Sequence, residues 1–190
     1  MRQGLKKFKS ETQGARTREG ALIGENFVRD ILEAFGIEDL SKTQFQKQFY
    51  YETITIRTSL KPDFIINNSS TGKNIYKGVD YLFIESKFKQ ISGSDWEKLE
   101  SNFGFHDWFY NELCNVKCKT IVILTGYWSI LERKYPLFMN YFKLKYGKET
   151  IFDFASQPEI KRFARFLNVD WTDELDKKVS EIYNKYQQIK

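Results

Sequence analysis

The sequence predicts an α/β protein with a mixed central β-sheet flanked by helices. Short segments rich in β-branched and aromatic residues alternate with longer ones in which apolar residues recur every three or four positions. One segment, 119–124, is a continuous apolar run, typical of a strand buried on both faces of a sheet. The length of 190 residues suits one domain with a sizeable core and is short for two.

The N-terminal half begins with a basic arm, residues 1–16, which either touches phosphates or is a solvated tail. Residues 17–35 place their apolar side chains on one broad helical face, and Gly36 is a suitable residue to end that helix. Strands are expected next over residues 45–57, 63–67 and 79–87. The turn-rich segment 67–73 separates the last two of them.

The C-terminal half alternates helices with strands. Helices are expected over residues 95–112, 129–145 and 158–167, and from Thr172 onward. The buried strand 119–124 and a short strand near 150–154 lie between them. The last helix carries an apolar stripe made of Leu175, Val179, Ile182, Tyr186 and Ile189. We interpret this stripe as packing on its own domain, because two heptads are too few to predict a coiled-coil dimer seam.

The composition excludes several classes of protein. No run of about 18 apolar residues predicts a membrane span, and residues 1–20 contain no apolar segment of a secretory signal. Cys114, Cys118 and the single histidine, His106, are too few to predict a zinc site, so we expect reduced thiols and a cytoplasmic protein. No phosphate-binding loop of the G-x-x-x-x-G-K-[ST] kind is present, so no use of ATP is expected. The net charge of +5 is modestly basic.

Charged residues mark the ends of two neighbouring predicted strands. Asp63 follows Pro62 and precedes an apolar run, and Glu85, Ser86 and Lys87 end the next strand. Residues two apart on a strand point to the same face, so Glu85 and Lys87 project together and Ser86 points away. Two carboxylates and an ammonium at one sheet edge suit a divalent cation and an activated water. The alternative is that Glu85 and Lys87 form a surface ion pair that contributes little to stability. This alternative does not explain why Asp63 and Glu85 both lie on neighbouring predicted strands.

This chemistry fits the hydrolysis of a phosphodiester bond. Mg²⁺ prefers oxygen ligands, and Asp63 and Glu85 would supply two carboxylates. The metal would act as a Lewis acid and lower the pKa of its bound water. Lys87 would position the attacking water or neutralise charge that develops on the phosphate.

Pro62-Asp63, followed after 21 intervening residues by Glu85-Ser86-Lys87, resembles the PD-(D/E)XK, or restriction-endonuclease-like, nuclease superfamily. Residues 87–99, with a Ser-Gly-Ser turn before Glu-Lys-Leu, are similar to an extension seen in some restriction-type and phage-borne members. The resemblance covers about 17–125 and implies an αβββαβ catalytic core, with extra C-terminal helices over 126–190. It implies a single nuclease domain.

The resemblance also implies an activity and partners. A type II restriction endonuclease would cleave double-stranded DNA with Mg²⁺, for which Mn²⁺ substitutes, and would act as a homodimer with one active site per strand. An acid on the first helix often joins such sites, and Glu25 matches that position. Gln90 is a further catalytic candidate that would orient the water, and its alternative is a polar loop residue.

Several residues are candidates for contacts with DNA. They are Lys89, Ser92, Ser94, Lys98, Lys161, Arg162 and Arg165. The two serines also suit a plain helix cap, and the lysines and arginines also suit a solvated face. We interpret His106 and the aromatic residues of 127–145 as packing groups rather than as a base or a nucleic-acid platform.

Other functions use the same residues. The resemblance admits a Holliday-junction resolvase, a homing endonuclease or a nicking endonuclease. A catalytically silent DNA-binding module would lack a motif acid or the lysine, and here none is missing. A small-molecule enzyme that uses Glu85 and Lys87 for acid–base chemistry would need a ligand pocket instead of a basic cleft.

Overall fold

The computed structural model describes residues 13–42, 62–89, 107–113, 115–126 and 136–188. The predicted strand 45–57 lies outside these ranges, as do most of the predicted helix 95–112 and the start of the one near 129–145. Outside them too lie seven residues singled out above: Gln90, Ser92, Ser94, Lys98, His106, Cys114 and Ile189.

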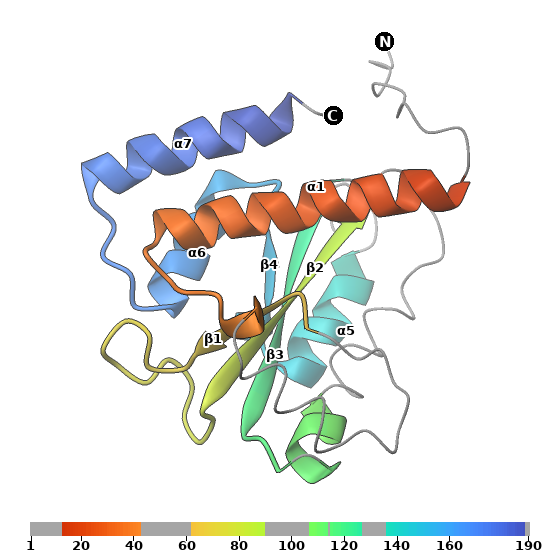
Figure 1. The fold of residues 1–190 in the computed structure, drawn as a ribbon, viewed down its shortest axis with the longest axis vertical. Helices are drawn as coiled ribbons and strands as arrows, with labels where there is room; N and C mark the ends of the chain where they lie inside the picture. Colours follow the sequence, from red (N-terminus) through yellow and green to blue (C-terminus); the bar gives the residue numbers. More distant parts are fainter. Residues whose placement is uncertain (1–12, 43–61, 90–106, 114, 127–135, 189–190) are drawn as a thin grey trace.

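A mixed sheet forms the centre of the described part of the chain (Figure 1). Its strands are β1 (Phe64–Asn67), β2 (Tyr81–Lys89), β3 (Cys118–Gly126) and β4 (Ile151–Asp153), in the order β1-β2-β3-β4. β1 pairs antiparallel with β2, whereas β2, β3 and β4 are parallel. The parallel pairs require crossovers, which explains why helical segments separate these strands in the sequence.

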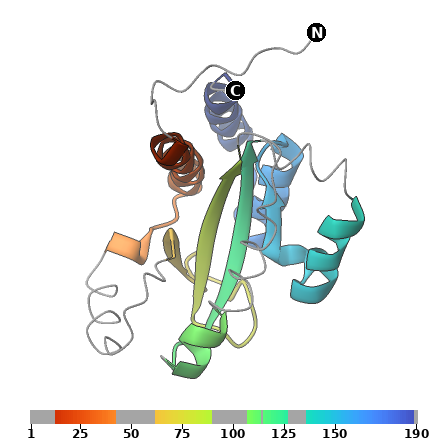
Figure 2. The same cartoon turned by 90° about the vertical axis from the view of Figure 1, so that its right-hand side faces the viewer.

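Helices flank the sheet on both sides, as Figure 2 shows for α1 and α5. The α-helices are α1 (Gln13–Ala34), α5 (Pro136–Tyr146), α6 (Gln157–Phe166) and α7 (Asp173–Gln187). Short helical turns are η1 (Leu40–Lys42), η3 (Phe109–Leu113) and η4 (Lys148–Thr150). The predicted mixed α/β architecture is therefore confirmed. Within the described ranges, no helix has the length and apolar character needed to cross a membrane.

The larger core fills the face of the sheet over which α1 runs. Side chains from alternate strand positions, such as Ile84 and Ile123, pack there with Phe27 and Ile31 of α1 and Phe163 of α6. The opposite face carries a smaller cluster of Ile65, Phe83, Phe109, Tyr110, Val116 and Cys118. Neighbouring residues of a strand point to opposite faces. Leu82 and Ile84 of β2 therefore join the larger core, whereas Phe83 joins the smaller cluster.

Several predictions about elements are confirmed. The apolar run 119–124 is the centre of β3, where Thr120–Thr125 are all buried. Gly36 follows α1 with a positive φ of 69°. The hydroxyl of Thr172 caps α7 by accepting a hydrogen bond from Leu175 N. The apolar stripe of α7 packs on its own domain, since Leu175, Val179 and Tyr186 are buried in the α1 core.

Several boundaries differ from the predictions. β2 spans Tyr81–Lys89 rather than 79–87. α1 begins at Gln13, so residues 13–16, expected in the arm, are helical; three of these four residues, Gln13, Ala15 and Arg16, are good helix formers. The end of the helix expected over 95–112 is the π-helical turn η3, Phe109–Leu113. Side chains of this segment form hydrogen bonds to β3.

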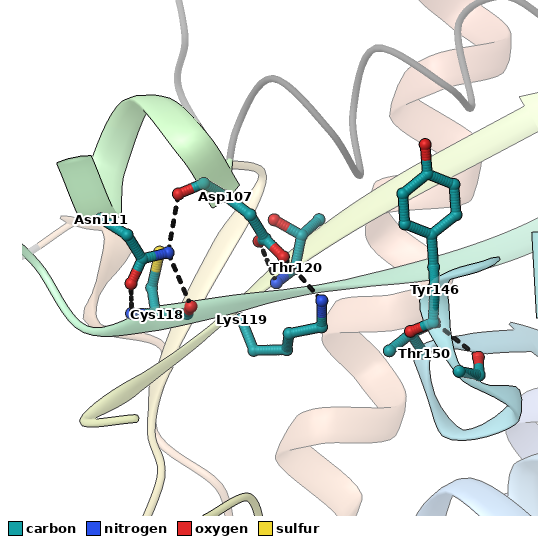
Figure 3. Close-up of polar contacts among 8 residues, drawn as sticks. Asp107, Asn111, Cys118, Lys119, Thr120, Tyr146 and Thr150 are labelled. Carbon is teal, nitrogen blue, oxygen red and sulfur yellow. Dashed lines mark hydrogen bonds and ion pairs between the residues drawn. The ribbon is translucent and has the colours of Figure 1, made fainter. Parts of the chain in front are cut away.

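Those hydrogen bonds extend the edge of β3 (Figure 3). β4 pairs with Val122–Leu124, so the earlier part of β3 extends past it. There the Asn111 amide accepts from Cys118 N at 3.1 Å and donates to Cys118 O at 3.0 Å. The Asp107 carboxylate accepts from Thr120 N and from the Lys119 ammonium, each at 2.7 Å. Side chains thus replace a neighbouring strand at this edge.

Candidate functional site

Asp63 and Glu85 converge where β1 begins. Phe64, the first residue of β1, pairs antiparallel with Ile84 of β2. Asp63, just before β1, therefore lies beside the residues that follow Ile84 on β2. The Asp63 carboxylate accepts a hydrogen bond from Ser86 N at 2.7 Å, and this joins two segments that are 23 residues apart. The acids therefore meet at one edge of the sheet, as the motif predicts.

Glu85 and Lys87 form an ion pair beside Asp63. The Lys87 Nζ to Glu85 Oε2 distance is 2.6 Å, and the side chains are 25% and 4% exposed, respectively. The two side chains project together, as their spacing on the strand predicts. The intervening Ser86 points to the opposite face, where its Oγ lies next to Gly24 of α1. The ion pair is thus partly buried, and the charges on this edge interact strongly.

The pKa of Asp63 shows how strongly the charges interact. Burial is the largest influence, and it raises the pKa of Asp63 from its usual 3.8 to about 7, with the negative charges of Glu85 and Glu25 acting in the same direction. The Lys87 ammonium and the hydrogen bond from Ser86 N oppose the rise. Without a bound cation, the site therefore favours the neutral form of Asp63 more than water does.

The pKa of Lys87 indicates the form in which this side chain acts. Burial, the largest single influence, lowers the pKa of Lys87, but the nearby carboxylates outweigh it and raise that pKa above the usual 10.5. Lys87 is consequently an ammonium at neutral pH in this structure. Its chemistry here is that of a hydrogen-bond donor and a compact positive charge, rather than of a base.

Glu25 joins the same electrostatic cluster from α1. Its neighbour Gly24 packs directly against the Ser86 side chain. The charge of Glu25 contributes to raising the pKa of both Asp63 and Lys87. Glu25 thus lies within electrostatic reach of Asp63 and Lys87.

The donor set of this edge fits Mg²⁺. Among the described residues, no group of three or more His, Cys, Asp or Glu side chains forms a metal-binding cluster. Mg²⁺ does not need one, because it is bound through one or two carboxylates and completes its shell with water and substrate phosphate. Asp63 and Glu85 provide two carboxylates. The charge of Glu85 helps to raise the pKa of Asp63, an effect that a bound divalent cation would oppose.

The predicted DNA-contacting residues of α6 lie elsewhere in the fold. α6 packs on β4, and β3 separates β4 from β2 in the sheet. The Arg162 guanidinium binds Glu159 and the carbonyls of Lys148 and Ile151, and it stacks over Phe152 at 4.1 Å. These contacts hold Arg162 at the junction of α6 and β4. The structure therefore does not bring Arg162 together with Asp63.

The flanking cations of α6 are more accessible than Arg162. Arg165 is exposed. Lys161 is also exposed, and its Nζ lies 5.2 Å from the centre of the Trp171 ring. Lys89 is the last residue of β2, two positions beyond Lys87. These three residues remain predicted contacts with DNA.

Sequence reasoning did not find the role of Gly24. A glycine inside an amphipathic helix lowers helix stability, and such a residue often marks a close approach of two backbones. That signal was present in the sequence. Sequence reasoning also missed the main-chain N–H of Ser86 that binds Asp63. No pattern in the sequence could have indicated this group, because every non-proline residue has a main-chain N–H.

No protein-family model, no curated protein and no solved structure matches this chain.

Proposed function

We propose that this protein is a Mg²⁺-dependent endonuclease that hydrolyses phosphodiester bonds of double-stranded DNA, of the restriction type. One observation carries the proposal: Asp63 binds the main chain of Ser86, between the two members of the Glu85–Lys87 ion pair. Two acids and an ammonium thus converge from separate segments. A surface ion pair on one strand would not require the buried acid on its neighbour.

Each residue has a distinct role in this proposal. Asp63 and Glu85 would hold Mg²⁺, or Mn²⁺ in its place, and Glu25 would add negative charge from α1. When bound, the metal supplies Lewis acidity and an activated water. The hydrogen bond from Ser86 N orients the Asp63 carboxylate. Lys87, an ammonium bound to Glu85 Oε2, would donate to the attacking water or to a phosphate oxygen as negative charge develops.

We further propose that the protein acts on DNA as a homodimer in the cytoplasm. A duplex has two strands of opposite direction, and a two-fold dimer presents one site to each of them. The modest positive charge of +5 favours approach to the phosphate backbone. Light scattering on the purified protein, with and without a DNA duplex, would measure whether two chains associate.

Plasmid digestion tests the proposed activity. With Mg²⁺, the wild-type protein should convert plasmid DNA into discrete fragments, and Asp63→Ala and Lys87→Ala should each reduce cleavage by at least about 100-fold, the scale of a lost electrostatic contact in a transition state. Asp80→Ala is the matched control, because Asp80 is an exposed acid just before β2. Equal cleavage by all four proteins would show that a contaminant cuts the DNA and would refute the proposal.

The pattern of products separates the related activities. Open circles alone would indicate a nicking enzyme, and preferential cleavage of four-way junctions would indicate a resolvase. A polar hollow among the described residues is lined by Asn67, Asn68, Ser69, Asn74 and Asp80, at the opposite end of the β1–β2 pair from Asp63.

A further inference from the structure

α1 approaches the sheet very closely at Gly24. A Cβ atom at this position would lie 2.9 Å from Phe88 Cβ, 2.9 Å from Thr125 Oγ1 and 3.0 Å from Ser86 Oγ. Carbon atoms in favourable contact lie about 3.5–4.0 Å apart. Because Phe88 Cβ is fixed to the backbone of β2, no rotamer change removes this clash. Any residue larger than glycine would push α1 away from the sheet.

This close approach is costly to the fold. Glycine is a poor helix former, yet Gly24 is buried in the middle of the 22-residue helix α1. The hydroxyl oxygens Ser86 Oγ and Thr125 Oγ1 are also buried there, and neither has a hydrogen-bond partner among the described residues. Buried hydroxyls without partners are unfavourable. Stability alone therefore does not explain this contact.

The place where α1 meets the sheet suggests another reason for the contact. Ser86 stands between Glu85 and Lys87, and its N–H binds Asp63. Gly24 packs on that same Ser86, and Glu25 follows it in the helix. Since consecutive Cα atoms are about 3.8 Å apart, the distance between helix and sheet at Gly24 determines how near Glu25 lies to the acid pair.

We propose that Gly24 is a positioning residue that holds Glu25 close enough to Asp63 and Glu85 to act on the same divalent cation. The inference rests on the proposed function. Gly24 touches neither metal nor substrate, and its effect passes through Glu25.

Calorimetric titration with Mn²⁺, without DNA, tests the inference. Gly24→Ala should weaken Mn²⁺ binding by about 10- to 100-fold, the range for residues that support metal ligands. Glu25→Gln should weaken it by a similar factor. In the Glu25→Gln background, Gly24→Ala should cause no further loss, because the group through which it acts is already gone. If Gly24 had only a structural role, the losses of Mn²⁺ affinity from Gly24→Ala and Glu25→Gln would multiply in the double variant.

Three further variants guard against a failure of Gly24→Ala to fold. Thr125→Ala removes one of the contacting atoms and serves as the control, which should bind Mn²⁺ like the wild type. The double variant Gly24→Ala/Thr125→Ala should recover part of the affinity. Glu25→Asp leaves the helix in place and withdraws the carboxylate by one methylene, so it should also weaken binding about tenfold or more.

The outcomes separate the two proposals. Two results would overturn the positioning role while leaving the nuclease proposal intact. One is that the losses of Mn²⁺ affinity caused by Gly24→Ala and Glu25→Gln multiply in the double variant. The other is that Glu25→Asp and Glu25→Gln bind Mn²⁺ like the wild type. Failure of the wild-type chain itself to bind Mn²⁺ would overturn the proposed metal-dependent function, and the positioning role with it.

Discussion

At Asp63, the fold places a carboxyl group where ionisation is unfavourable. Burial and the neighbouring acids raise its pKa to about 7, whereas the unfolded chain has the ordinary value of 3.8. Between these values the folded state binds a proton that the unfolded state has lost. The contribution of Asp63 to stability is therefore fully present below about pH 4, and it is lost as the pH rises through 7.

Asp63→Asn should make this dependence visible. The Asn side chain can still accept the hydrogen bond from Ser86 N, but it never ionises. The free energy of unfolding of Asp63→Asn, relative to that of the wild type, should rise from pH 4 to pH 8. Urea unfolding at a series of pH values, without metal, measures this difference. A difference independent of pH would contradict the raised pKa. Asp80→Asn, at an exposed acid, is the control.

At the scale of single elements, the edge of β3 is completed by side chains rather than by a strand. Asn111 in η3 binds both main-chain groups of Cys118, which is buried, and also donates to Asp107 O at 2.7 Å. These bonds anchor the segment that leads into β3.

Asn111→Ala should destabilise the protein by about 2–3 kcal/mol, because it deprives buried main-chain groups of their partners. Glu112→Ala, at the exposed neighbour in the same turn, should change stability by no more than about 0.5 kcal/mol. Urea unfolding at one pH compares the two variants. Similar stabilities for both would show that the Asn111 bonds contribute little to anchoring β3.

At the scale of the whole molecule, α7 joins the end of the chain to its first described helix. Tyr186 stacks on Phe27 of α1 with ring centres 4.6 Å apart, and its hydroxyl donates to Asp30 Oδ2 at 2.9 Å. Lys185 adds an ion pair to Asp30 at 2.8 Å. α7 therefore holds α1, the helix that carries Glu25, against the rest of the core.

Two substitutions at Tyr186 separate its hydrogen bond from its packing. Tyr186→Phe keeps the stacked ring and should cost about 1 kcal/mol. Tyr186→Ala also leaves a cavity beside Phe27 and should cost about 3 kcal/mol. Lys177→Ala, on the exposed side of α7, is the control. Thermal unfolding ranks the three variants. If Tyr186→Ala were no worse than the control, α7 would not stabilise α1.

Features that depend on local backbone geometry could be predicted from the sequence. The period of two along a strand places Glu85 and Lys87 together, the continuous apolar run predicts the buried β3, and Thr172 before an acidic turn predicts the start of α7. The apolar stripe of α7 also predicted correctly that this helix packs on its own domain. Such patterns can be read from neighbouring residues alone.

The tertiary structure decided what depends on contacts between distant segments. It places the Asp63 carboxylate on the Ser86 N–H, packs Gly24 against the sheet, and binds the Arg162 guanidinium to the carbonyls of Lys148 and Ile151. No local pattern encodes these contacts, because each depends on strand register and on how closely a helix packs. A slip of one residue in register would turn Asp63 or Glu85 to the other face of the sheet. The site thus exists only in the folded chain.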